Sequence, residues 1–357
     1  MKILDRYILK EMISPFLMAL GGFIIFMVAD IMFLMADQII NKGVPVIVIL
    51  QMLVLKLPAI LVLTFPVALL FSTMLGLGNL SSNYEIAALR TSGVSFFRIM
   101  APVFAAGIFF SFLTIVVNEK ISPWAFHKSE NIVRRMIVRQ AVPFMATNVF
   151  FRGPENKIFY VGSADKNTGI MYNVMVFDMS EGRYPQLTTA SEATYDLSHW
   201  YLRNGTINKF DSMGRIQYEV AFRELTLQIN VDPAAFFAGQ KTPFEMTMKE
   251  LGEQVKLFDK SGINVQEMKM DLYLKLSVPF ACLITCLIGA PLSVRFPRGG
   301  RLAGIAVSIT IIFIYYALLS VGRALGKNGM LNPFMAAWLP NIIIGVLGIY
   351  LVTNEQW

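Results

Sequence analysis

The sequence predicts an α-helical membrane protein, a bundle of about six transmembrane helices with a β-rich domain inserted between helices 3 and 4. Three observations support this fold class. Hydrophobic residues make up 55% of the 357 residues, charged residues only 15%, and the mean hydropathy is +0.56. Soluble domains usually contain about 25% charged residues, so no soluble fold of this size accounts for the composition. Long apolar runs near both ends flank a central stretch of ordinary polarity.

The apolar runs are long enough to cross a membrane, because about 20 helical residues span about 30 Å of hydrocarbon. They lie near residues 13–36, 45–76, 97–118, 272–294, 302–323 and 334–353. Pro58 and Pro66 within the second run favour a kink. We therefore divide the chain into helices 1–3 over residues 1–118, an insert over 119–268 and helices 4–6 over 269–357.

Basic residues predict the orientation of these spans. One set of loops and the N-terminus contain Lys2, Arg6, Lys10, Arg90, Arg98, Arg295, Arg298 and Arg301. The short loops on the opposite side contain only Lys42, Arg323 and Lys327. By the positive-inside rule both termini are cytoplasmic and the insert is outside, which is the periplasm in a bacterium with two membranes. The net charge of +7 follows from this distribution, so we expect no nucleic-acid partner.

The insert has the pattern of an antiparallel β fold, because β-branched and aromatic segments alternate with turn-forming residues. The segments are Lys157–Gly162, Val174–Asp178 and Tyr195–Leu202, and the turns are Asn167–Gly169, Glu181–Gly182 and Asn204–Gly205. This spacing predicts a sandwich or a similar fold. Residues 247–260 then have the spacing of an amphipathic helix, with Leu251, Val255 and Phe258 on one face.

Motifs for catalysis or metal binding are scarce. Cys282 and Cys286 lie one helical turn apart in an apolar run, which favours small buried side chains over a disulfide. Two histidines, His127 and His199, offer little material for a metal site. The chain lacks a Walker A pattern, and residues 326–328 hold only a lone Gly-Lys pair. We expect a chain that is not an enzyme, holds no cofactor and cannot hydrolyse ATP by itself.

The most informative segment is LSSNYEIAALRTSG, residues 80–93, in the loop after the second span. Ser82 and Glu85 have the spacing of a capping box, which predicts a new helix, and Gly93 is a natural stop. Two interpretations of Glu85 follow from the residues alone. It caps the backbone, or it belongs to a short surface helix that docks a cytoplasmic partner and passes the partner's movement into the bundle.

The chain resembles the LptF/LptG (YjgP/YjgQ) permease family of lipopolysaccharide exporters. The resemblance rests on FPVALLFSTMLGLGNLSSNYEIAALRTSG, on the opening LDRYI, on APLSVRFPRGGR at 290–301 and on the order of three spans, domain and three spans. It covers essentially the whole chain. LDRYI and DQIINKG resemble LptG whereas PLSVRFPRGGR resembles LptF, so the paralogue is not assigned. The resemblance implies that the insert is a periplasmic β-jellyroll.

The resemblance also implies a function and partners. The chain would be a permease subunit of an ABC-type exporter in the bacterial inner membrane. It would extract lipopolysaccharide from the outer leaflet and pass it to a periplasmic bridge of LptC/LptA-like jellyroll proteins. A second LptF/LptG-type subunit would complete a homodimer or heterodimer. Residues 80–92 would be the coupling helix that sits in a groove of an LptB-like ATPase, and that ATPase would bind the ATP and Mg²⁺.

Within that implied coupling helix, Glu85 occupies the position of the family's acidic coupling residue. The neighbouring residues expected to contact the ATPase are Tyr84, Ile86, Leu89 and Arg90.

Charged residues near the outer ends of the spans are candidates for substrate contacts. Lys42, Arg134, Arg135, Arg139, Arg323 and Lys327 lie there. Their side chains suit the phosphates of lipid A, although a solvated or headgroup-anchoring face has the same composition. Asp30 and Lys56 lie within spans one and two, where charge is costly. They form an ion pair, or Lys56 extends to the interface, or one of them faces a cavity.

Other classes of function remain open on the sequence alone. A membrane scaffold or sensor, whose periplasmic domain binds a partner and signals inward, needs neither a cavity nor a lipid-binding domain. A lipid-modifying enzyme would need a nucleophile, carboxylate pair or metal set that does not stand out here. A secondary transporter would rely on midplane ionisable groups, for which Asp30 and Lys56 are the only good candidates.

Overall fold

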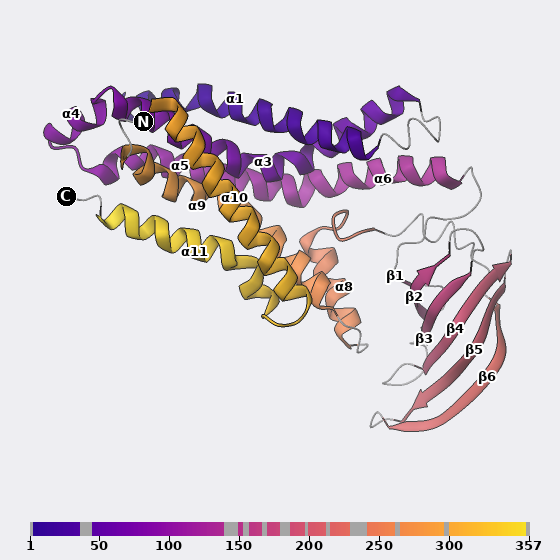
Figure 1. The fold of residues 1–357 in the computed structure, drawn as a ribbon. Helices are drawn as coiled ribbons and strands as arrows, with labels where there is room; N and C mark the ends of the chain where they lie inside the picture. Colours follow the sequence, from indigo (N-terminus) through magenta and orange to yellow (C-terminus); the bar gives the residue numbers. More distant parts are fainter. Residues whose placement is uncertain are drawn as a thin grey trace. The chain divides into compact units, whose positions relative to one another are not determined.

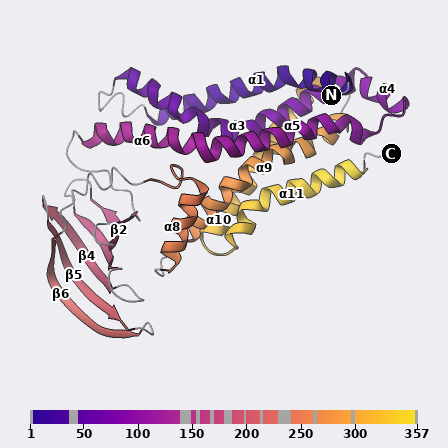
Figure 2. The same cartoon turned by 180° about the vertical axis from the view of Figure 1, so that it is seen from behind.

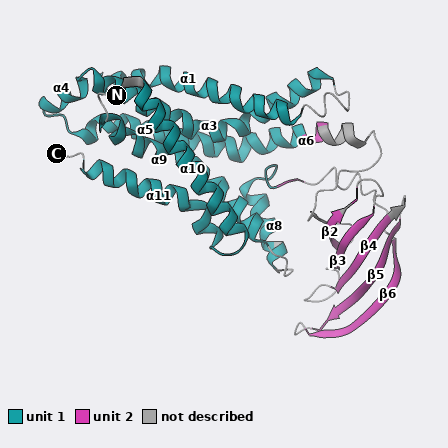
Figure 3. Cartoon of the chain, in the orientation of Figure 1, with its two compact units in different colours: residues 1–129, 243–357 teal, residues 130–242 magenta. Residues whose placement is uncertain are grey.

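The computed structural model of the chain describes residues 3–35, 45–138, 149–152, 157–165, 170–178, 186–196, 199–211, 215–228, 241–260, 265–295 and 300–354. The chain divides into two compact units (Figure 3). A helical unit contains residues 1–129 and 243–357, and a β unit contains residues 130–242. The β unit is narrower than the predicted insert of 119–268, because residues 119–129 and 243–268 belong to the helical unit.

The described helices include six that are long and apolar enough to cross a membrane. They are α1 (Ile3–Leu34), α3 (Val46–Ser82), α5 (Phe96–Val116) with its continuation, α9 (Gln266–Arg295), α10 (Gly300–Lys327) and α11 (Pro333–Asn354) (Figure 1). Helix α5 continues through a π-helical turn, Val117–Ile121, into α6 (Ser122–Val138). The six predicted spans are confirmed. The first turns of α1, the last turns of α11 and the short helix α4 (Glu85–Thr91) lie at one end of the unit (Figures 1 and 2).

Helix α3 lies at the centre of the helical unit, and its buried stretch includes every residue from Thr64 to Met74. Small side chains let neighbouring helices approach closely, as is usual in membrane bundles. A Cβ atom added to Gly76 would lie 3.1 Å from Met12 of α1. Cys282 and Cys286 of α9 are fully buried in the same apolar cluster, which confirms their predicted role as small buried side chains.

A buried polar group joins α9, α10 and α11 within the bundle. Asn341 donates to the carbonyl of Ser277 at 2.8 Å and accepts a hydrogen bond from the Tyr315 hydroxyl at 3.1 Å. The Ser277 hydroxyl in turn donates to the carbonyl of Ala337. Because lipid offers no alternative partners, these internal bonds specify how the three helices pack.

Helix α8 (Met248–Lys260) confirms the predicted amphipathic helix, since Leu251, Val255 and Phe258 are all buried. A capping box starts it. The Thr247 amide donates to Glu250 at 2.8 Å and the Glu250 amide donates to the Thr247 hydroxyl at 3.2 Å.

The β unit contains a six-stranded antiparallel sheet in the sequential order β1-β2-β3-β4-β5-β6. The strands are β1 (Val149–Arg152), β2 (Lys157–Ala164), β3 (Met171–Asp178), β4 (Gln186–Asp196), β5 (His199–Phe210) and β6 (Ile216–Gln228). The β-rich insert between the third and fourth membrane helices is therefore confirmed. The described strands form one strongly curved sheet (Figures 1 and 2) rather than two packed sheets.

Two local predictions in the insert are wrong. Tyr195–Leu202 is not one strand, because Asp196 pairs with His199 across the β4–β5 hairpin. The expected turn at Asn204–Gly205 lies inside β5. The reason is that Asn204 uses its left-handed conformation, with φ of 50°, to bend a strand instead of reversing it.

The bend belongs to a crease that crosses the sheet. Asn173 of β3 also has a positive φ, of 51°, and lies opposite Gly162 of β2, where an added Cβ would be 2.8 Å from the Cβ of Asn173. Across this crease the alternation of buried residues shifts by one position. The apolar face of the sheet therefore continues across the crease, with Phe159, Val161, Val174, Val176, Trp200 and Leu202 in its buried cluster.

Candidate functional site

The loop after the second span forms helix α4, as predicted, but a capping box does not start it. The Ser82 hydroxyl donates back to the carbonyl of Asn79 at 3.0 Å, within α3. The N-cap is Tyr84, which has a left-handed conformation, with φ of 61°, and makes no side-chain cap bond. The capping-box prediction is wrong because α3 continues through Ser82 and a tight left-handed turn, not a Ser cap, separates the two helices.

The end of α4 matches the prediction. Gly93 has a φ of 88°. Its amide donates to the carbonyl of Arg90, and the Val94 amide donates to that of Leu89, both at 3.0 Å. This is the Schellman pattern, in which glycine supplies the left-handed residue after a helix. Gly93 therefore fixes the residue at which α4 ends.

One face of α4 anchors it to the membrane helices. Ile86 is 2% exposed and lies in the cluster with Leu80 of α3 and Ile99 of α5, and Leu89 packs against the same cluster. Ile86 and the half-buried Leu89 therefore hold the helix in place, and their expected contact with an ATPase stays a prediction. The outward surface contains Tyr84, Ala87, Ala88 and Thr91, all exposed, while Glu85 and Arg90 are half-buried at its border.

Three polar contacts, here called the α1 clamp, join the first turns of α1 to the elements around α4. Asp5 forms an ion pair with Arg98 of α5 at 2.5 Å. The Tyr7 hydroxyl donates to Oε2 of Glu85 at 2.7 Å. The Asn79 amide of α3 donates to Glu11 at 3.4 Å.

The sequence interpretation missed Asp5, Tyr7 and Glu11 and assigned Arg98 to orientation alone. The sequence did contain a signal for these contacts. Asp5 and Glu11 are two carboxylates within the first turns of a membrane helix, where charged side chains generally pair with other polar groups.

At the opposite end of the helical unit, two of the predicted substrate-binding cations form ion pairs. Arg323 of α10 pairs with Asp271 of α9 at 2.7 Å, and Lys327 pairs with Glu267 of α9. The sequence interpretation missed these two carboxylates, which lie 52 and 60 residues away. Lys42 and Arg139 lie outside the described residues. Arg134 and Arg135 lie in α6, and their side chains are likewise outside the described part.

The two charges inside the spans do not meet. Among the described side chains no ion pair joins Asp30 to Lys56, so that hypothesis is not supported. Asp30 is exposed on α1. The Lys56 ammonium lies 5.3 Å from the centroid of the Phe126 ring, which is within the range of a cation–π contact.

Two carboxylates hold the residues that precede and begin α8 within the helical unit. Oε2 of Glu245, whose side chain is fully buried, lies 2.6 Å from Nδ1 of His127. Glu119, in the π-helical turn, accepts from the Met248 amide at 2.9 Å and thereby satisfies a free donor at the start of α8. The described residues contain no group of three or more His, Cys, Asp or Glu side chains placed to hold a metal ion.

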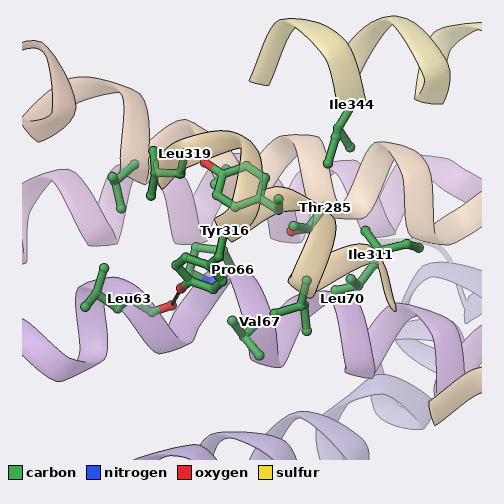
Figure 4. A pocket seen from close by; sticks show the side chains of 13 residues that line it. Leu63, Pro66, Val67, Leu70, Thr285, Ile311, Tyr316, Leu319 and Ile344 are labelled. Carbon is green, nitrogen blue, oxygen red and sulfur yellow. Dashed lines mark hydrogen bonds between the residues drawn. The ribbon is translucent and has the colours of Figure 1, made fainter. Parts of the chain in front are cut away.

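A small, partly open pocket lies between α3, α9, α10 and α11 (Figure 4). Leu63, Pro66, Leu70, Ile311 and Ile344 are among the residues that line it. The lining is almost entirely apolar.

The hydroxyl groups around the pocket bond to the protein itself. The Tyr316 hydroxyl donates to the carbonyl of Leu63 (Figure 4), and the Thr285 hydroxyl donates to that of Cys282. The pocket therefore offers apolar contact and not catalytic chemistry.

Comparisons with known proteins agree along the whole chain. The family model for the lipopolysaccharide export system permease LptF/LptG matches residues 6–354. The permease protein LptF of Escherichia coli (strain K12) is 18% identical over 353 residues, which cover 98% of this chain and 94% of that protein. LptG of the same strain is 20% identical over 367 residues and LptG of Haemophilus influenzae 22% over 371, each covering 99% of both chains.

Both paralogues match at similar identity, so the comparisons leave LptF and LptG equally supported. The match includes α4, all six membrane helices and the β unit between the third and the fourth. The chain belongs to the LptF/LptG family of lipopolysaccharide export system permeases.

Proposed function

We propose that this chain is the permease subunit of an ATP-driven exporter that extracts lipopolysaccharide from the outer leaflet of the bacterial inner membrane. Family membership supports lipopolysaccharide as the substrate, and the geometry of α4 supports a transmission of movement from an ATPase. A short helix between two spans, with one face fixed in the bundle and the other exposed, is suited to receive a push from a cytoplasmic partner. That geometry is the observation that carries the proposal.

The partner that displaces α4 is an LptB-like ATPase, which binds the ATP and Mg²⁺. Its contact surface on this chain is Tyr84, Ala87, Ala88 and Thr91, with Glu85 at the border. Because Ile86 and Leu89 join α4 to the ends of α3 and α5, α4 cannot move without these membrane helices. ATP binding and hydrolysis thereby close a cavity formed with a second LptF/LptG-type subunit. No covalent step occurs in this chain.

The substrate leaves toward the periplasm, where the β unit receives it and passes it to LptC/LptA-like jellyroll proteins. The continuous apolar face of the curved sheet, with Phe159, Val176 and Trp200, supports a role in holding acyl chains. In this proposal both termini and α4 are cytoplasmic. The even number of membrane helices and the shared end of α1, α4 and α11 agree with that orientation.

The ion pairs of α10 refine the expected contacts with lipid A phosphates. Arg323 and Lys327 are compensated by Asp271 and Glu267, so a phosphate must compete with a carboxylate at these positions. Arg323 is the better candidate of the two, because a guanidinium can bind two oxygen atoms at once.

The test is purification of the tagged chain from its own host in mild detergent, with mass spectrometry of the proteins that co-purify. A P-loop ATPase is expected with the native chain and lost with Glu85→Lys, which places a cation where the partner is expected to offer one. Glu253→Lys is the matched control, because Glu253 is an exposed carboxylate on α8 and its variant should retain the ATPase. An intact complex without an ATPase in every sample would contradict the proposal and favour the sensor alternative.

A further inference from the structure

Helix α1 is the least embedded of the six membrane helices. No residue in the most apolar stretch of α1 is buried within the chain, whereas 61% of the residues in the corresponding stretch of α9 are buried. The buried residues of α1 are Ile8 and Met12, both in its first three turns. The Ser72 hydroxyl of α3 also donates to the carbonyl of Met12 at 2.7 Å. The buried residues and the polar contacts of α1 therefore lie at the end that carries the α1 clamp, whereas Phe16 and Phe23 farther along make ring contacts, with Phe110 of α5 and Phe71 of α3.

The α1 clamp reaches three different elements from that one end. Glu11 contacts α3, Tyr7 contacts α4 and Asp5 contacts α5. The contacts to α4 and α5 lie on opposite sides of the loop that ends α4. A displacement of α4 consequently changes the positions of the partners that hold α1.

Within the α1 clamp, the bond from Tyr7 has a second consequence for Glu85. It occupies Oε2 of the carboxylate, and among the described residues that side chain makes no other polar contact. Oε1 is then available to a cationic side chain of a partner. A carboxylate already held in one orientation loses less conformational freedom when it binds, which strengthens binding.

We propose that Tyr7 is a positioning residue: it orients the Glu85 carboxylate for the ATPase and transmits displacement of α4 to α1. This inference rests on the proposed function, because it assumes that an ATPase moves α4. It adds that α1, whose most apolar stretch is not buried within this chain, is the element that responds. Asp5 and its ion pair with Arg98 support the same linkage from the α5 side.

The experiment uses the complete complex in lipid nanodiscs. Spin labels are attached at Met18→Cys of α1 and Val346→Cys of α11, both exposed positions. Cys282 and Cys286 are fully buried and should stay unlabelled. Distances between the labels are measured by pulsed electron resonance with and without a non-hydrolysable ATP analogue, together with ATPase co-purification.

With the native chain, the analogue is expected to change the distance between α1 and α11. Tyr7→Phe, which removes only the hydroxyl, should retain bound ATPase but lose most of that change. It should weaken transport by roughly two- to tenfold, as expected for loss of one hydrogen bond to a charged group at a partly exposed site. Tyr350→Phe makes the same chemical change at an exposed tyrosine of α11 and should behave like the native chain.

A second set of variants tests the α5 side. Asp5→Arg and Arg98→Asp should each reduce the distance change, and the double swap should restore it because the ion pair re-forms in reverse.

The inference is overturned if Tyr7→Phe shows the same distance change and transport as the native chain while the ATPase remains bound. It is also overturned if the swap restores nothing. Absence of the ATPase from the native complex would instead overturn the proposed function, and the inference with it, so the two failures are distinguishable.

Discussion

The two ends of the helical unit use charge in opposite ways. At the α4 end, the polar contacts join elements on different sides of a loop, since Asp5, Tyr7 and Glu11 of α1 reach α5, α4 and α3. At the α8 end, Arg323 and Lys327 of α10 are neutralised by carboxylates of one neighbouring helix, α9. The first arrangement joins one helix to three other elements, whereas the second joins two adjacent helices. A charge near a membrane surface is thus informative only once its partner is known.

The largest expected effect comes from breaking the anchor of α4. Ile86→Asp places a carboxylate at a position that is 2% exposed, where an unpaired charge costs about 3–5 kcal/mol. We expect α4 to detach from the apolar cluster around Leu80 and Ile99, and the ATPase to be lost from the purified complex. Thermal unfolding of the purified chain in detergent and ATPase co-purification would measure both effects.

The neighbouring position supplies the control for the anchor. Ala87→Asp adds the same charge to the exposed face of α4 and should change the free energy of unfolding by about 0.5 kcal/mol or less. Equal destabilisation by the two variants would show that Ile86 does not anchor the helix.

An intermediate effect is expected at the α8 end, where Glu245 has a fully buried side chain beside His127. Glu245→Leu leaves Nδ1 of His127 without this partner and should cost about 1–3 kcal/mol of unfolding free energy. Glu245→Gln retains an acceptor and should cost less. Glu253→Leu, on the exposed face of α8, is the control and should be nearly neutral. If the Glu245→Leu variant were as stable as the native chain, the contact between Glu245 and His127 would not stabilise this end of the helical unit.

The smallest effect is the coupling between Arg323 and Asp271. The Arg323 side chain is 41% exposed, so a double-mutant cycle with Arg323→Ala and Asp271→Ala should give about 1 kcal/mol or less. The cycle is measured by thermal unfolding at low and at high salt, and the coupling should fall as salt screens the pair. A coupling of several kcal/mol that salt does not change would contradict the description of this pair as a partly screened contact.

Periodicity and glycine chemistry predicted much of the helical unit. The spans were predictable because a lipid-crossing helix must be long, apolar and hydrogen-bonded within itself. The end of α4 was predictable at Gly93 because few residues adopt the left-handed conformation that this stop requires. The start of α4 was not, because the Ser82–Glu85 spacing fits a cap equally well when the preceding helix continues through Ser82.

The β unit shows the same limit. Its strand-rich character followed from β-branched and aromatic residues, but Asn204–Gly205 has the composition of a hairpin turn and lies within β5. The sequence pair specifies that a left-handed residue is tolerated there. Whether the chain reverses or only bends depends on which strands lie alongside, and that is a property of the whole sheet.

By itself the sequence determined the membrane class, the spans, the inserted β unit, the buried cysteines and the family. These follow from local composition and from motifs whose physical requirements are met within about 20 residues. Tertiary structure alone decided that Ile86 faces inward, that Tyr7 holds Glu85 across 78 positions of sequence and that Asp271 compensates Arg323. The reason is that a side chain's partner depends on which helices pack together, and local spacing carries no information about that choice.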